Sequence, residues 1–282
     1  MNPAIRVAHS PDSDDAFMFY ALAQGLVDTE GLTYVHELQD IETLNQRALR
    51  GELEVTAVSI HAYASISDRY ALLTSGASMG DGYGPRLVAR SSDGDERGGQ
   101  RTRGKRVAIP GPLTSAYLAL RLYEPDFVAV PMAFDRIEDA VANADVDMGL
   151  LIHEGQLTYA SRGLSLVVDL GAWWKAETGL PLPLGGNVVR KDLGTDLLVK
   201  ISRHLRASIA YGLSHRADAV DHAMKYARGL DRAQADTFVG MYVNDWTLDY
   251  GDRGRRAISE FLGRGVRAGL IKPDFTVEFI ED

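Results

Sequence analysis

The chain has 282 residues, of which 45% are hydrophobic and 24% charged, so it can bury a large core and form more than one domain. It contains no cysteine, which excludes disulfides, thiolate metal sites and cysteine nucleophiles. Its 30 Lys and Arg against 39 Asp and Glu give a net charge of −9, so we expect neither nucleic acid nor a membrane as a partner.

The N-terminal segment does not resemble a secretory signal. Residues 1–20 carry one Arg and three Asp at positions where a signal peptide has its apolar core. No apolar run in the chain reaches the ~18 residues typical of a membrane-spanning helix. We therefore expect a cytoplasmic protein.

The first 70 residues alternate between short apolar runs and segments with helical periodicity. Ser13 or Asp14 is the predicted cap of the first helix, which stops near Gly25, and Asp40 is the predicted cap of the second, which stops at Gly51. Strands are predicted at 5–9, 32–38 and 55–58, the last leading through Ser59 into a further helix. This βαβαβα order predicts a largely parallel sheet covered by helices.

A second series follows a glycine-rich break at 76–84. A strand at 85–90 and an exposed polar loop at 91–104 precede it. Its predicted elements are strands at 106–109, 127–130 and 148–152, a helix from Thr114 and a helix at 134–144. An extended Leu-Pro segment at 180–186 leads into 187–189, and the chain is then helical to about Arg267.

Two βα series separated by two extended crossings indicate an α/β protein with two lobes. The first lobe is predicted to be discontinuous, with residues 1–88 and 188–282, and the second to comprise 89–187. One continuous doubly wound sheet is the alternative, but single sheets rarely need two long Gly/Pro-rich crossings. We expect a small molecule to bind between the lobes.

Motifs for nucleotides and metals are incomplete. The glycines of 80–85 are followed neither by Lys-Ser/Thr nor by a helix, as the phosphate-binding loops require. His153 lacks a second His four residues on, and His215 and His222 are expected on an exposed helical face. No cofactor and no metal are predicted.

Three predicted strand-to-helix turns carry small polar residues. They are the turn at Ser10, the turn at Ser59 and the turn at Thr114-Ser115-Ala116. Helix N-termini present unpaired N–H groups that suit a carboxylate, and ligands of open α/β sheets bind beyond the carboxyl ends of the strands. Each turn alone is an ordinary helix cap; together they favour a site for a small carboxylate.

His153 ends the apolar strand at 148–152, where functional side chains concentrate in such sheets. A single histidine is most often structural or simply exposed. Its position makes His153 the candidate general base.

Several segments together resemble the 1,4-dihydroxy-6-naphthoate synthases of the futalosine route to menaquinone. The resemblance covers nearly the whole chain and is carried by GLLIHE at 149–154, VDLGAWW at 168–174, TGLPLPLG at 178–185, DIETLN at 40–45 and the Ser-Pro turn at 10–11. The double Trp with the Leu-Pro alternation is the most specific of these signals.

The resemblance implies a type II periplasmic-binding-protein fold used as a lyase. His153 matches the family's proposed general base, and Asn45, Ser59, Ser115 and Ala116 match positions that line its cleft. The implied reaction converts cyclic dehypoxanthinylfutalosine to 1,4-dihydroxy-6-naphthoate by proton removal and loss of the sugar-derived part. It needs neither metal nor redox cofactor.

The first turn departs from the family pattern. The family reads Ser-Pro-Cys-Pro-Asn-Asp-Thr-Phe, whereas this chain has Asp12, Ser13 and Asp14 within that stretch. Additional carboxylates beside an anionic substrate cost affinity unless they point outward or meet a cation. Two alternatives stay open: another small-acid lyase such as a chorismate dehydratase, and a non-catalytic solute-binding protein.

Overall fold

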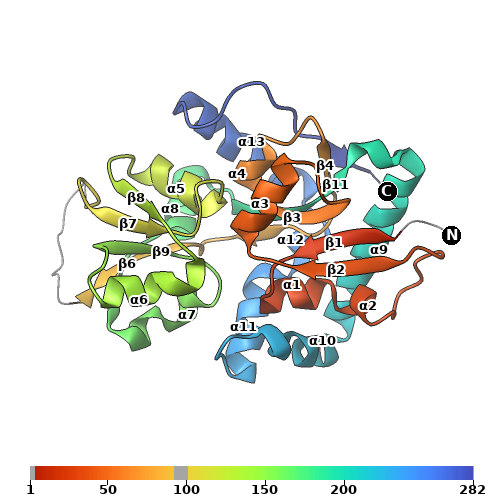
Figure 1. The fold of residues 1–282 in the computed structure, drawn as a ribbon, viewed down its shortest axis with the longest axis horizontal. Helices are drawn as coiled ribbons and strands as arrows, with labels where there is room; N and C mark the ends of the chain where they lie inside the picture. Colours follow the sequence, from red (N-terminus) through yellow and green to blue (C-terminus); the bar gives the residue numbers. More distant parts are fainter. Residues whose placement is uncertain (1–3, 92–100, 282) are drawn as a thin grey trace.

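The computed structural model describes residues 4–91 and 101–281, which form two α/β lobes joined by two crossings (Figure 1). Within these residues one sheet has seven strands and the other has five. We call the lobe around the seven-stranded sheet the large lobe, and the other the small lobe. The fold class predicted from the sequence is confirmed.

The sheet of the large lobe is mixed rather than largely parallel. Its strands are β1 (Ile5–His9), β2 (Tyr34–Leu38), β3 (Val55–Ser59), β4 (Tyr70–Leu73), β5 (Ser78–Gly80), β11 (Leu182–Arg190) and β12 (Phe279–Ile280). They follow the order β12-β4-β11-β3-β1-β2, with β5 on β11. β1 pairs in parallel with β2 and β3, but β11 returns from the small lobe and lies antiparallel between β3 and β4.

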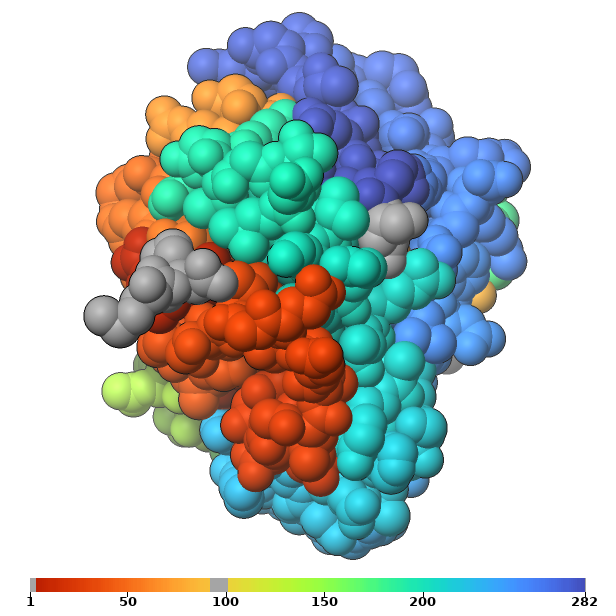
Figure 2. Space-filling model, turned by 90° about the vertical axis from the view of Figure 1, so that its right-hand side faces the viewer, coloured from red at the N-terminus to blue at the C-terminus, as the bar shows by residue number. Residues whose placement is uncertain are grey.

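Helices cover both faces of this sheet. They are α1 (Ser13–Met18), α2 (Tyr20–Ala23), α3 (Ile41–Leu49), α4 (Ile60–Tyr63), α9 (Thr195–Ser214), α10 (Arg216–Ala223), α11 (Arg232–Tyr242), α12 (Asp245–Leu248) and α13 (Gly251–Arg267). Figure 2 shows the side of the large lobe remote from the small lobe, where α9 lies between the N-terminal elements and the C-terminal segments. The predicted helical stretch that ends at about Arg267 is confirmed.

The small lobe comprises a second mixed sheet and its helices. Its strands are β6 (Arg86–Arg90), β7 (Arg106–Ile109), β8 (Val128–Pro131), β9 (Met148–Leu151) and β10 (Leu164–Asp169), in the order β10-β6-β9-β7-β8. Its helices are α5 (Ser115–Tyr123), α6 (Ile137–Ala142), α7 (Gly155–Thr158) and α8 (Leu170–Thr178). Of the loop expected at 91–104, residues 92–100 lie outside the described part. Thr102 is buried rather than exposed, and its N–H donates to the Glu124 carboxylate.

The crossings lie a few residues before the positions expected from the sequence. β6, from Arg86, already belongs to the small sheet, and β11, from Leu182, already belongs to the large sheet. The chain therefore passes between the sheets at 81–85 and 179–181. The sequence predicted only an extended segment at 180–186, because proline is uncommon inside sheets. In the structure β11 begins at Leu182, and its Leu-Pro segment pairs with the short β5.

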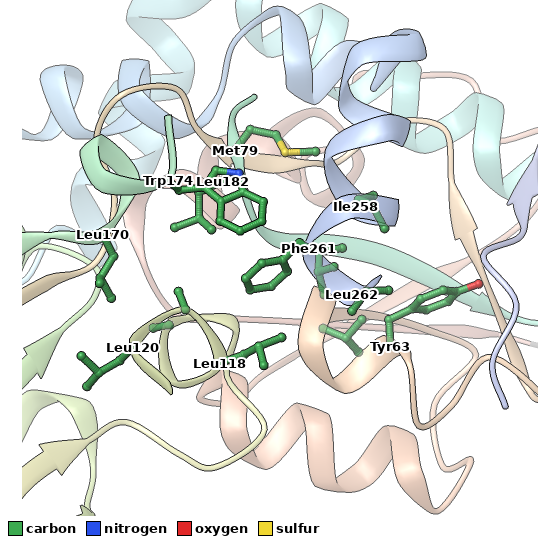
Figure 3. Close-up of a cluster of buried hydrophobic side chains, with 14 of the residues drawn as sticks. Tyr63, Met79, Leu118, Leu120, Leu170, Trp174, Leu182, Ile258, Phe261 and Leu262 are labelled. Atoms are coloured by element: carbon green, nitrogen blue, oxygen red, sulfur yellow. The ribbon is translucent and has the colours of Figure 1, made fainter. Parts of the chain in front are cut away.

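A hydrophobic cluster joins the lobes on one side (Figure 3). It combines Leu118 of α5 and Trp174 of α8 with Phe261 of α13 and Tyr63 of α4. The rings of Trp174 and Phe261 lie 5.4 Å apart, edge to face. The lobes thus share a core instead of being tethered by crossings alone.

Among the described residues, no helix combines the length and the apolar composition that crossing a bilayer requires. The cytoplasmic location stays a prediction.

Candidate functional site

A cleft lies between the lobes and is partly open to solvent; its space, together with the open solvent at its mouth, amounts to about 720 Å³. Its walls come from the turns that follow β1 and β3 in the large lobe, and from the turns that follow β7 and β9 in the small lobe. The carboxyl ends of these strands therefore face one another across the cleft, which is the edge where α/β sheets bind ligands.

Six of the seven residues predicted for the site line this cleft: Ser10, Ser59, Thr114, Ser115, Ala116 and His153. The seventh, Asn45, does not line it and is fully buried behind Ser59. Its side-chain oxygen accepts from the Ser59 N–H at 2.9 Å, and its Nδ2 donates to Ser59 Oγ at 3.1 Å. Asn45 thus fixes the turn after β3 and does not face the cleft.

The hydroxyls at the start of α5 are already engaged. Thr114 caps the helix, accepting from the Tyr117 N–H at 3.2 Å. Ser115 Oγ donates to the Leu184 carbonyl at 2.6 Å and accepts from the His61 N–H at 3.1 Å, so it joins the small lobe to the large one. What these residues offer the cleft is backbone N–H, since helix geometry leaves those of Ser115 and Ala116 without intrahelical acceptors.

His153 occupies the turn after β9 in a left-handed backbone conformation, with φ +53°. Its Nδ1 lies 3.0 Å from Oδ2 of Asp12, which belongs to the β1–α1 turn of the large lobe. The edge of the Phe134 ring packs against the imidazole at 4.7 Å between centroids. The second nitrogen, Nε2, has no hydrogen-bond partner among the described residues.

Asp12 and His153 favour each other's charged forms. Burial alone would raise the pKa of Asp12, but the charge and hydrogen bond of His153 lower that pKa to about 2. Burial would likewise lower the pKa of His153, but the Asp12 carboxylate raises it above its ordinary value. Asp12 is thus an additional carboxylate that is paired with a titratable base. It is also the N-cap of α1, where the sequence had favoured Ser13 or Asp14.

The pKa values of the other acids beside Asp12 and His153 are raised, which favours their neutral forms. Burial and the neighbouring carboxylates of Asp12 and Asp15 raise the pKa of Asp14 well above its usual range. Burial and Asp12 raise the pKa of Asp15 in the same way, although the Ser10 N–H that donates to it at 2.6 Å opposes the shift. Burial also raises the pKa of Glu154. The part of the cleft around Asp12 and His153 therefore carries less negative charge than its number of carboxyl groups suggests.

Asp12, Asp14 and His153 also place ligand-type atoms within 4.8 Å of one another, a spacing that a metal ion bridges. Two of the three already satisfy each other through the hydrogen bond between Nδ1 and Oδ2. We therefore interpret the cluster as a hydrogen-bonded acid–base pair beside Asp14, whose pKa is raised.

Sequence reasoning missed residues that reach the cleft from distant elements. The Tyr242 hydroxyl of α11 and the side-chain amide of Gln156 of α7 are hydrogen-bonded at 2.7 Å, across the lobes. Asn187 of β11 lines the cleft, and its side-chain oxygen is buried without a partner among the described residues. In the sequence, only the two glycines directly before Asn187 distinguish its position. No local pattern indicates that Tyr242 contacts Gln156.

Two lobes, two crossings and a cleft at the strand ends define the periplasmic-binding-protein class of folds. Solved structures agree: the alkanesulfonate-binding protein of Xanthomonas axonopodis pv. citri, 12% identical, aligns with a TM-score of 0.68 over 98% of this chain and 97% of that one. At that identity the likeness shows the fold alone.

The family is shown by the sequence comparisons. The family model described as menaquinone biosynthesis matches residues 5–267, and the chain belongs to this family. A 1,4-dihydroxy-6-naphthoate synthase from Thermus thermophilus is 43% identical over 270 residues, covering 96% of this chain and 97% of that protein. One from Streptomyces coelicolor is 37% identical over 273 residues, covering 95% and 94%. A crystal structure from Archaeoglobus fulgidus is 48% identical, with a TM-score of 0.89 over 95% of this chain and 98% of that one.

Proposed function

We propose that this chain is a carbon–carbon lyase that converts cyclic dehypoxanthinylfutalosine to 1,4-dihydroxy-6-naphthoate in menaquinone biosynthesis. Membership of the menaquinone family and the two synthases at 43% and 37% identity support this reaction. The observation that carries it is the buried pair of Asp12 and His153 at the cleft, with Nε2 of His153 unpartnered.

His153 is the base of the proposed reaction. Nδ1 faces Asp12, so the neutral imidazole carries its proton on Nδ1 and keeps the lone pair of Nε2 for the substrate. Removing a proton from the substrate builds negative charge, and loss of the sugar-derived part then leaves the aromatic naphthoate. A positioned base of this kind contributes typically about 10²–10⁴-fold in rate.

The substrate carboxylate is proposed to bind at the start of α5. The N–H groups of Ser115 and Ala116 point out of a helix N-terminus, which favours an anion. Among the described residues that line the cleft there is no Lys or Arg, while Asp12, Asp14 and Asp15 are present. This lining suits a ligand with a single carboxylate better than a phosphate-rich ligand.

The direct test is to incubate the protein with the cyclic precursor and to follow naphthoate by absorbance and mass. We expect naphthoate together with the released sugar-derived fragment in equal amounts. Chorismate, incubated separately, tests the dehydratase alternative. Tight binding of the precursor without any product would instead indicate a binding protein and would refute the proposed reaction.

A further inference from the structure

The pair formed by Asp12 and His153 bridges the two lobes. Asp12 follows β1 in the large lobe, and His153 follows β9 in the small lobe. The side chains retain only 3% and 15% of their exposure, so the contact is shielded from water. The Phe134 ring that packs against His153 belongs, like His153 itself, to the small lobe.

The Asp12 carboxylate is held in place independently of His153. Its Oδ1 accepts from the Asp15 N–H at 3.2 Å as the N-cap of α1, and its Oδ2 faces the imidazole. A carboxylate fixed by its own helix orients the ring and determines which nitrogen carries the proton.

A second contact between the lobes lies directly beside the pair. Arg228 of the large lobe donates to the Pro11 carbonyl at 3.1 Å, and its guanidinium carbon lies 4.5 Å from the centre of the Phe134 ring of the small lobe. Phe134 in turn packs against His153. The turn that carries Asp12 and the ring that supports His153 are therefore brought together by the same approach of the lobes.

We infer that Asp12 is a positioning residue for His153 and that it acts only when the lobes meet, so that lobe closure completes the base. This inference rests on the proposed function, because it names the residue that prepares the proposed base.

The test must separate the effect of Asp12 on the imidazole from the effects of the other charged and titratable groups around it. Asp12, Asp14 and Asp15 face it from the large lobe, Glu154 adjoins it in the chain, and Arg228 acts through Glu154. Of these, Asp12 alone is hydrogen-bonded to the ring among the described residues. Removing the charge of Asp12 is therefore expected to change the pKa of His153 more than removing the charge of any of the other groups.

The experiment compares Asp12→Asn with the unchanged protein. Asn is as good an N-cap as Asp, so α1 is retained. Nitrogen NMR of labelled histidine, recorded without and with the naphthoate product and with the His153 signal assigned through His153→Ala, follows the ring without any turnover. We expect the titration of His153 to move to lower pH and its preference for the proton on Nδ1 to weaken. With the cyclic precursor, kcat should fall about tenfold or more and the acid limb of kcat/KM should move to lower pH.

Asp231→Asn is the matched control, because Asp231 caps α11 through the same kind of bond and does not line the cleft. It should leave the histidine signals and the pH profile unchanged. Asp12→Ser, which also preserves a cap, repeats the test should the Asn variant be unstable. An unchanged His153 titration in both Asp12 variants would overturn the inference and leave Asp12 a helix cap only. A shifted titration in a protein that does not convert the precursor would refute the proposed function alone.

Discussion

The backbone of His153 is strained, and the strain lies at the proposed reaction centre. A non-glycine residue in the left-handed region costs about 1–2 kcal/mol, and it persists only where the surrounding packing requires it. Here Phe134 and Asp12 hold the ring from two sides. The strained turn places the imidazole in the cleft while the next side chain, Glu154, is buried.

The first prediction concerns the pH dependence of activity. The Asp12 carboxylate outweighs burial and raises the pKa of His153, so the site with the two lobes in contact holds the imidazole protonated to a higher pH than a free histidine. A base must lose this proton before it acts. The acid limb of kcat/KM should therefore have its midpoint above the usual value of about 6.5, measured with the precursor from pH 5 to 9. A midpoint at or below that value would contradict the assignment.

Replacement of the base gives the second prediction. His153→Ala should lower kcat by about 10²–10⁴-fold, because it removes proton transfer but leaves the N–H groups of α5 in place. Product affinity should change less than tenfold, about 1.4 kcal/mol. His215→Ala, at an exposed position before α10, is the control and should be near neutral. Full activity of His153→Ala would require a different base.

The third prediction concerns Asp14 and stability. Its pKa is raised in the folded protein, so the stability it contributes is complete below the unfolded pKa, near 4, and is lost as the pH rises towards the folded pKa. Asp14→Asn removes this loss of stability with rising pH, and its side-chain amide still offers a hydrogen-bond donor near Asp12. Chemical denaturation should show a gain on the order of 1 kcal/mol at pH 8 and a smaller gain at pH 5. Asp218→Asn, exposed on α10, should show no such difference, and an equal effect at both pH values would argue against a neutral Asp14.

At the scale of elements, the sequence predicted what depends on local pattern. β1 and β7 have the expected bounds, and Asp40 and Thr114 cap α3 and α5 as expected. The direction of β11 was not predictable, because its antiparallel pairing depends on where the chain re-enters the large sheet. The Asp12 cap was missed because four polar residues in a row offer equivalent caps, and tertiary contact with His153 selects among them.

The first crossing depends on a glycine in the small lobe. A Cβ at Gly171, in the first turn of α8, would lie 1.8 Å from the Tyr83 carbonyl oxygen and 2.6 Å from the Gly84 nitrogen. Both are backbone atoms, so no side-chain rotation relieves the overlap. The crossing at 81–85 is thus clamped between α8 and the large lobe, where the Tyr83 hydroxyl donates to the Met241 carbonyl.

The fourth prediction follows from that contact. Gly171→Ala should destabilise the protein by about 1–3 kcal/mol, because the crossing must shift to admit the methyl group. Gly263→Ala is the control: it lies inside α13, where its nearest neighbour is the flexible end of Arg267 at 3.3 Å. In a helix interior this replacement should be neutral or stabilising by up to about 1 kcal/mol. Chemical denaturation of both variants measures this difference in stability. Equal stability of the two variants would show that the crossing is loosely packed.

At the scale of the whole molecule, the site is made of pairs that no local pattern predicts. The turns that supply Ser59, Ser115 and His153 could be placed at strand ends, since the βα order implies a common edge. The pairing of Asp12 with His153, or of Gln156 with Tyr242, requires the relative placement of two lobes. That placement is determined by the shared core of Trp174 and Phe261, whose residues are far apart in the sequence.

The shared core and the cleft contacts lead to the last prediction, which concerns closure. In this structure the lobes also meet where the Leu113 N–H donates to the Glu42 carboxylate at 3.2 Å and where Ser115 binds Leu184. These contacts must separate to admit the substrate, whereas the core of Trp174 and Phe261 stays packed because its exposure would cost several kcal/mol. The lobes are therefore expected to rotate about that core, with the crossing at 179–181 as the hinge.

Solution scattering measures this rotation directly. We expect the radius of gyration to fall when the naphthoate product is added, since closure around a ligand excludes water from the cleft. Glu42→Ala, which removes one of the contacts between the lobes, should enlarge the free protein and still allow compaction by the product. If the product left both proteins unchanged in size, the lobes would be fixed, and the pairing of Asp12 with His153 would be a permanent contact rather than one formed by closure.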